Sequence, residues 1–111
     1  MTLQQKQSIF AANVAKLINY IFSKGYSCSL GEAYRTSEQA AIYAKEGKGI
    51  IDSLHCKRLA IDINLFDSSG NFLSEASYYS DIAKYWESLH SDNRAGINFK
   101  RIDADHFEMK E

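Results

Sequence analysis

The segment from Leu59 to Phe66 constrains the fold more than any other part of the chain. Its sequence, Leu-Ala-Ile-Asp-Ile-Asn-Leu-Phe, places a large aliphatic side chain at every second position. Because successive side chains of a strand point to opposite faces, this pattern predicts a strand with one face in a hydrophobic core. Asp62 lies on the other face, between two isoleucines. A carboxylate this close to a core is costly unless it is paired or bound to a metal, so Asp62 marks a candidate site.

Helical patterns lie on both sides of this strand. Apolar residues recur at intervals of three and four over residues 3–23 and again over residues 78–90, which predicts two amphipathic helices. Thr36, followed three residues later by Gln39, fits a capping box and predicts a short helix that Gly47 ends.

The remaining elements are short. Alternating or small-residue segments predict strands at residues 26–34, 97–100 and 105–109, with loops at 47–54, 67–71 and 91–96. A chain of 111 residues has the length of one domain. We therefore expect residues 1–111 to form a single α+β domain with a small, mainly antiparallel sheet and flanking helices.

Charge and hydropathy exclude several classes of partner. The 13 basic and 14 acidic residues give a net charge of -1 and no basic cluster, so neither nucleic acid nor an anionic membrane surface is indicated as a partner. No stretch approaches the roughly 20 apolar residues that span a bilayer. We expect a monomer without an integral membrane segment.

The cysteines and the N-terminus bear on the compartment. Cys28 and Cys56 are too few for a disulfide framework, and free thiols are favoured although one bridge remains open. Lys16 and Asn19 interrupt the apolar residues near the N-terminus, which is not typical of a signal peptide. We expect synthesis in the cytoplasm.

Two histidines near Asp62 and near the C-terminus complete a candidate metal site. His55 lies seven residues before Asp62, and His106 lies in Asp-Ala-Asp-His-Phe-Glu near the end of the chain. Catalytic zinc takes three such ligands and keeps one position for water. If the two strands are neighbours, His55, Asp62 and His106 form this set, and Asp103 is placed to accept a proton from the water.

These residues also resemble a known family. Ser-Leu-His-Cys-Lys-Arg-Leu-Ala-Ile-Asp at 53–62 resembles the Ser-x-His-x-x-Gly-x-Ala-x-Asp motif of D-alanyl-D-alanine carboxypeptidases and dipeptidases and of phage L-alanyl-D-glutamate endolysins. Residues 103–108 resemble the Asp-x-x-His-Phe-Glu element that ends their catalytic domain. Tyr-Arg-Thr at 34–36 resembles their upstream Tyr-Arg-Ser/Thr element. The three elements stand in family order, and the likeness spans residues 25–109.

The resemblance implies a zinc peptidase with the small α+β fold of lysostaphin-type peptidases and hedgehog signalling domains. It implies Zn2+ ligands at His55, Asp62 and His106 and a general base at Asp103. It also implies that Arg35 contacts a carboxylate or an oxyanion, for which a planar guanidinium is suited.

Other positions of the motifs carry secondary expectations. Ser53 and Glu108 are candidates for orienting a ligand histidine or contacting substrate. Arg58 stands where the motif has Gly, which puts the loop geometry and the substrate preference in question. The family's Gly-Gly-x-Trp segment is only approximated at residues 95–99.

Simpler interpretations remain open for single residues. Asp62 could pair with Lys57 or Arg58 instead of a metal. Asp103 could be a turn-forming aspartate, and Arg35 a surface charge. Cys56 could compete as a thiolate ligand, although adjacent residues of an extended segment point in opposite directions. Asp105 is expected to be solvated or to lie behind the ligands.

The leading hypothesis is a zinc metallopeptidase that hydrolyses a bond in peptidoglycan stem peptides, as a phage endolysin acting on the cell wall after release by a holin. A D-alanyl-D-alanine carboxypeptidase of the same family is the first alternative. A zinc-binding module without catalysis is the second, and a phage structural or regulatory protein with a fortuitous motif is the third.

Overall fold

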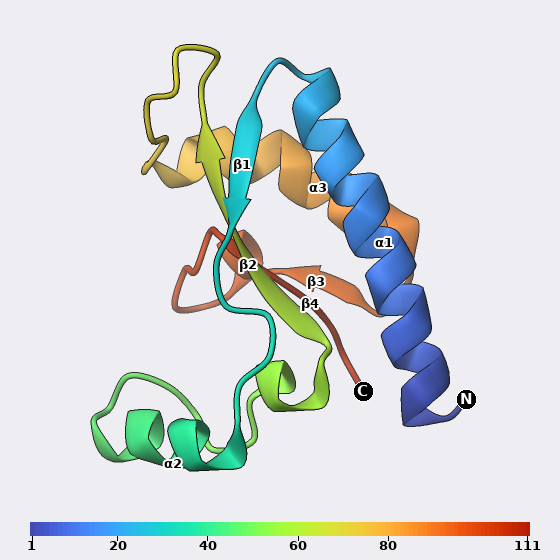
Figure 1. The fold of residues 1–111 in the computed structure, drawn as a ribbon, viewed down its shortest axis with the longest axis vertical. Helices are drawn as coiled ribbons and strands as arrows, with labels where there is room; N and C mark the ends of the chain where they lie inside the picture. The colour runs from blue at the N-terminus through green and yellow to red at the C-terminus, as the bar shows by residue number, and fades with distance from the viewer.

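A four-stranded antiparallel sheet forms the centre of the computed structural model, which describes residues 1–111 (Figure 1). Its strand order is β1-β2-β4-β3, with bounds β1 Ser27–Leu30, β2 Ala60–Phe66, β3 Asn93–Ala95 and β4 His106–Met109. The helices are α1 Leu3–Ser23, α2 Ser37–Lys45 and α3 Ser80–Leu89. The predicted α+β class with an antiparallel sheet is confirmed. No helix combines the length and the apolar character that a membrane span needs.

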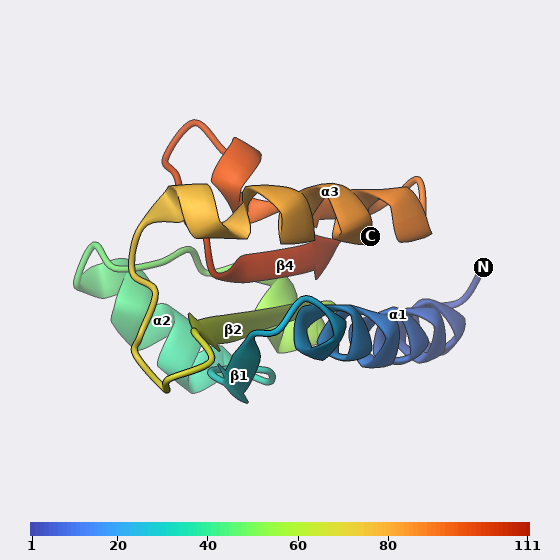
Figure 2. The same cartoon turned by 90° about the horizontal axis from the view of Figure 1, so that it is seen from above.

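The core lies between the sheet and two helices. α1 and α3 pack against each other and against the strands, whereas α2 lies apart from them near the start of β2 (Figures 1 and 2). Trp86 of α3 is fully buried, with its ring edge-on to Phe10 of α1 and near Phe107 of β4. The predicted apolar face of β2 is in this core: Leu59, Ile61, Ile63 and Leu65 are all buried. Burial of each such side chain contributes about 1.5–3 kcal/mol.

The predicted strand at residues 26–34 is too long. β1 ends at Leu30, because two residues then face one on β2: Gly31 N–H donates to the Asp62 carbonyl, and Asp62 N–H donates to the Glu32 carbonyl. A side chain at position 31 would crowd Asp62, since an added Cβ would lie 3.1 Å from the Asp62 Cβ. The irregular segment carries the chain past Asp62 toward α2.

The prediction was also wrong between residues 91 and 100. Asn93–Ala95, expected in a loop, is strand β3, and Gly96–Asn98 is a 3-10 turn instead of a strand. The Gly96 carbonyl accepts from the N–H groups of Phe99 and Asp103, which folds the chain back before β4. An added Cβ at Gly96 would lie 2.0 Å from the Asp103 carbonyl oxygen, so only glycine fits.

Arg58, at the position where the motif has Gly, adopts a backbone conformation that favours glycine. It ends the 3-10 turn Leu54–Lys57, which the sequence did not predict, with φ 56° and ψ 37° in the left-handed region. This region disfavours residues with a Cβ by roughly 1–2 kcal/mol. The guanidinium carbon of Arg58 lies 4.1 Å from the centroid of the Tyr34 ring, a cation–π contact that offsets part of this cost.

A double-mutant cycle tests this balance. With Tyr34→Ala already in place, we expect Arg58→Gly to raise the free energy of unfolding by about 1 kcal/mol, because it removes backbone strain and no ring contact remains to be lost. With Tyr34 present, the gain is smaller by about 0.5–1 kcal/mol. Urea denaturation of the four proteins measures both values, and equal gains in the two backgrounds would contradict the contact.

Candidate metal centre

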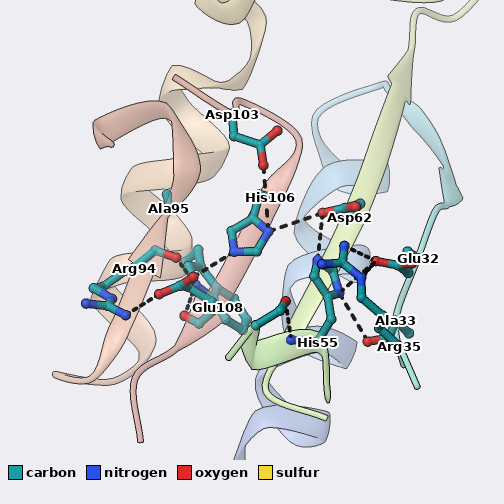
Figure 3. A network of polar contacts seen from close by, with 12 residues as sticks. Glu32, Ala33, Arg35, His55, Asp62, Arg94, Ala95, Asp103, His106 and Glu108 are labelled. Atoms are coloured by element: carbon teal, nitrogen blue, oxygen red, sulfur yellow. Dashed lines mark hydrogen bonds and ion pairs between the residues drawn. The ribbon is translucent and has the colours of Figure 1, made fainter. Parts of the chain in front are cut away.

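Sheet register brings two of the three predicted ligands together. Asp62 of β2 lies directly opposite His106 of β4, and the 3-10 turn that leads into β2 presents His55 to the same place (Figure 3). Asp62 Oδ1 lies 3.4 Å from His55 Nε2 and 3.3 Å from His106 Nδ1. The three ligand atoms all lie within 4.8 Å of one another, so one cation between them could contact all three.

Each histidine is oriented through its other ring nitrogen. His55 Nδ1 lies 3.2 Å from the Ala33 carbonyl oxygen, an acceptor for an N–H at this position. His106 Nε2 lies 2.7 Å from Glu108 Oε1. His55 Nε2 and His106 Nδ1 therefore both face Asp62, the arrangement that ligand histidines need. The donor set of two imidazoles and one carboxylate fits zinc.

Ser53 and Glu108 hold the two histidines from outside the ligand set. The Ser53 hydroxyl accepts from His55 N–H at 3.2 Å and caps the 3-10 turn. Glu108 is buried, and its carboxylate contacts His106 on one side and Arg94 on the other.

Burial and mutual charge shift the pKa values of the central groups. Burial raises the pKa of Asp62, but hydrogen bonds from His106 and His55 and their charges outweigh it and lower the value to about 2. Burial lowers the pKa of His106, but contacts with Asp62 and Glu108 raise it to about 9. In the metal-free protein His106 is therefore protonated at neutral pH, and an entering metal must displace that proton.

Asp103 lies beside this group but faces solvent. Its Oδ2 is 3.9 Å from His106 Nδ1, and its side chain is 58% exposed. The neighbouring Asp105 is half-buried. Burial and contact with Asp103 raise the pKa of Asp105 to about 6. Asp62, Asp103 and Asp105 form a second group that could hold a metal, sharing Asp62 with the first.

Arg35 reaches the site together with a residue that the sequence did not single out. Its Nε donates to Glu32 Oε1 at 2.8 Å, its Nη2 contacts the same oxygen, and its backbone N–H donates to the His55 carbonyl. The Arg35 side chain is largely buried, so it is not a free surface charge. Glu32 lies in the predicted strand at residues 26–34, where nothing in the local pattern marks it.

The structure decides three alternatives that the sequence left open. Asp62 contacts the two histidines, whereas Lys57 pairs with Glu111 and Arg58 stacks on a tyrosine ring. The Cys56 thiol lies 3.9 Å from the Thr36 carbonyl oxygen and is absent from the ligand group. Cys56 and Cys28 are both free thiols.

The ligand group opens into a cleft of about 620 Å³. Asp103 and the three ligands line it, with Ser53 and Glu108. Four cationic side chains also line the cleft: Arg35, Lys48, Arg94 and Arg101. Five carboxylates line it as well, at Asp52, Asp62, Asp103, Glu108 and Glu111, so the cleft is of mixed charge.

Comparison with known proteins shows the fold. No protein-family model matches this chain, and no curated protein matches it. Among solved structures, the chain is similar to the L-Ala D-Glu endopeptidase ChiX of Serratia marcescens, with a TM-score of 0.65 and 21% sequence identity. The match covers 76% of this chain and 67% of that one. The likeness shows that the two chains share a fold.

The raised pKa of His106 predicts a pH dependence of stability in the metal-free protein. The unfolded pKa is near 6.5 and the folded value is about 9, so the contribution of this histidine is complete below the first value and is lost as pH rises through the second. Urea denaturation with chelator should show the free energy of unfolding falling between these pH values. We expect His106→Gln to remove most of this slope and His90→Gln, outside the site, to keep it. A wild-type protein with no slope would contradict the pKa shift.

Proposed function

We propose that this protein is a zinc-dependent peptidase that hydrolyses the L-alanyl-D-glutamate bond of peptidoglycan stem peptides. One observation carries the proposal: His55 Nε2, Asp62 Oδ1 and His106 Nδ1 converge at the wall of a cleft, with each histidine held through its other nitrogen. A structural zinc takes four protein ligands, whereas three leave a position for substrate or water. The fold likeness to an L-Ala D-Glu endopeptidase supports the choice of substrate.

Asp103 is the general base in this proposal. Zinc bound to the three ligands would lower the pKa of a water molecule to about 7 and polarise the substrate carbonyl. Asp103 takes a proton from the attacking water and passes it to the leaving amine. Its exposed carboxylate lies 3.9 Å from a ligand nitrogen and lines the cleft in which a substrate would bind.

Arg35 stabilises the developing oxyanion in this proposal. Two of its five N–H donors, on Nε and Nη2, are directed at Glu32 Oε1, which leaves three donors on Nη1 and Nη2 for the substrate. These donors suit an oxyanion and equally the terminal carboxylate of a carboxypeptidase substrate. The choice of the endopeptidase therefore rests on the fold likeness.

The proposal also includes the domain organisation, the oligomeric state and the location of the substrate. The 111 residues act as one catalytic domain and as a monomer, and the substrate is cell-wall peptidoglycan, as for the endolysins that the motifs resemble.

Mass spectrometry of peptidoglycan digested with the zinc-loaded protein tests the bond. We expect new L-alanine carboxyl termini and D-glutamate amino termini, and activity that disappears with chelator and returns with zinc. Release of D-alanine alone would move the assignment to the carboxypeptidase. No product from a protein with zinc bound would favour the binding module.

Asp103→Asn tests the base separately from the metal. We expect kcat to fall roughly 10²- to 10⁴-fold, the usual contribution of general acid–base catalysis, while bound zinc stays at one equivalent per chain. Asp52→Asn, in the same cleft, is the matched control for loss of a carboxylate. Equal activity of wild type and Asp103→Asn would remove Asp103 from the mechanism.

A further inference from the structure

We infer that Arg94 is a positioning residue of the metal centre, which acts on the ligand His106 through Glu108. The inference rests on the proposed zinc site and adds to it a residue outside all the motifs that mark that site. Figure 3 shows the three side chains in a row, from Arg94 through Glu108 to His106, which in turn faces Asp62.

The two oxygens of Glu108 have different partners. Oε1 lies 2.7 Å from His106 Nε2, and Oε2 contacts the guanidinium of Arg94. The Glu108 side chain is only 8% exposed, so water supplies little of its solvation. A buried carboxylate needs a charged or hydrogen-bonded partner on each side. Arg94 supplies this partner on the side away from the histidine, which keeps Oε1 directed at Nε2.

Backbone register fixes this row. Arg94 of β3 lies directly opposite Glu108 of β4, and Glu108 is two residues from His106, on the same face of the strand. The buried Trp86 indole N–H donates to the carbonyl oxygens of both Arg94 and Glu108, at 3.2 and 3.0 Å. The helix α3 thereby ties the two strands together at the pair that supports the histidine.

The contact with Glu108 decides which ring nitrogen of His106 carries the proton. With the Glu108 oxygen at Nε2, the proton of the neutral ring stays on Nε2, and Nδ1 is left to face Asp62 and the metal. Without Arg94, the carboxylate can rotate away from the ring, and the proton can move to Nδ1, where it blocks the metal. Arg94 thus favours the binding of a cation although it is itself a cation that lines the same cleft.

Charge repulsion and the positioning role predict opposite changes in zinc affinity when Arg94 is removed, so one measurement separates them. Simple Coulomb repulsion predicts that Arg94→Ala binds Zn2+ more tightly, because a positive charge is removed from the cleft. The positioning role predicts weaker binding, by about 10-fold, as is usual when the partner of a ligand histidine is disturbed. Competition with a chromogenic chelator at fixed pH measures the dissociation constant of zinc without any assay of peptidase activity.

Three variants serve as comparisons in the same titration. Arg94→Lys keeps the charge without the planar fork and should recover part of the affinity. Arg101→Ala removes a cation from the same cleft and should leave zinc binding unchanged or tighter. Ile21→Val removes a methylene group from the buried face of α1, away from the cleft, and tests whether lost stability alone weakens zinc binding.

Nuclear magnetic resonance of the His106 ring supplies a second measurement. In the zinc-loaded wild type we expect a slowly exchanging Nε2–H proton, and in Arg94→Ala a faster exchange with water.

Unchanged or tighter zinc binding by a folded Arg94→Ala, with an unchanged Nε2–H signal, would overturn the inference and leave the proposed function intact. If the alanine variant does not fold, the same two measurements on Arg94→Met, which keeps the aliphatic stem without the charge, decide, and full wild-type affinity and exchange would likewise overturn it. A wild type that binds no zinc would instead remove the proposed function itself.

Discussion

The Asp62 carboxylate lies between two imidazole rings, and the arrangement of the site follows from that contact. Its oxygen is within 3.4 Å of a nitrogen on each ring, although His55 and His106 are 51 positions apart in the chain and come from different elements. A half-buried carboxylate in a core strand is stable only with such partners. The histidines in turn are held by the Ala33 carbonyl oxygen and by Glu108, so the polar contacts that begin at Asp62 continue into the segments on both sides of β2.

One face of the sheet therefore forms the core, and the other carries the candidate metal site. The apolar face of β2 packs against α1 and α3, and this packing sets the strand positions. The opposite face carries Asp62, with His106 beside it on β4. β4 shows the result most clearly, because all four of its residues are buried: Phe107 and Met109 in the core, and His106 and Glu108 under the cleft. A strand that is buried on both faces loses the alternation of exposed and buried residues by which strands are recognised.

The sequence was sufficient for those parts of the fold in which a local pattern carries the information. α1, β2 and α3 have long periodic stretches, and their bounds agree with the prediction to within two residues. β3 was missed because Asn93–Ala95 is three residues long and becomes a strand only through its pairing with β4. The 3-10 turn at His55 was missed for a related reason, since it depends on the Ser53 cap and on a left-handed Arg58.

The site shows the same division. The motifs indicated His55, Asp62, His106 and Asp103, and the structure places these four together. Glu32 and Arg94 could not be found in this way, because each lies in a short segment with no recognisable motif and acquires its role only from its neighbour in space. Arg94 depends on the strand register that Trp86 holds, which is a tertiary property.

The tight turn at Gly96 holds together the two ends of the loop that precedes the proposed base, Asp103. The Gly96 carbonyl accepts from Asp103 N–H, the Asp103 carbonyl accepts from His106 N–H, and the missing side chain at Gly96 lets the two segments touch. Six residues between these anchors, 97–102, form a closed Ω-like loop whose ends cannot move apart independently. Insertions and deletions within this loop can therefore change what the rim of the cleft presents to a substrate while the carboxylate and its histidine keep their spacing. The loop is the part of this architecture in which specificity can diversify without disturbing the chemistry.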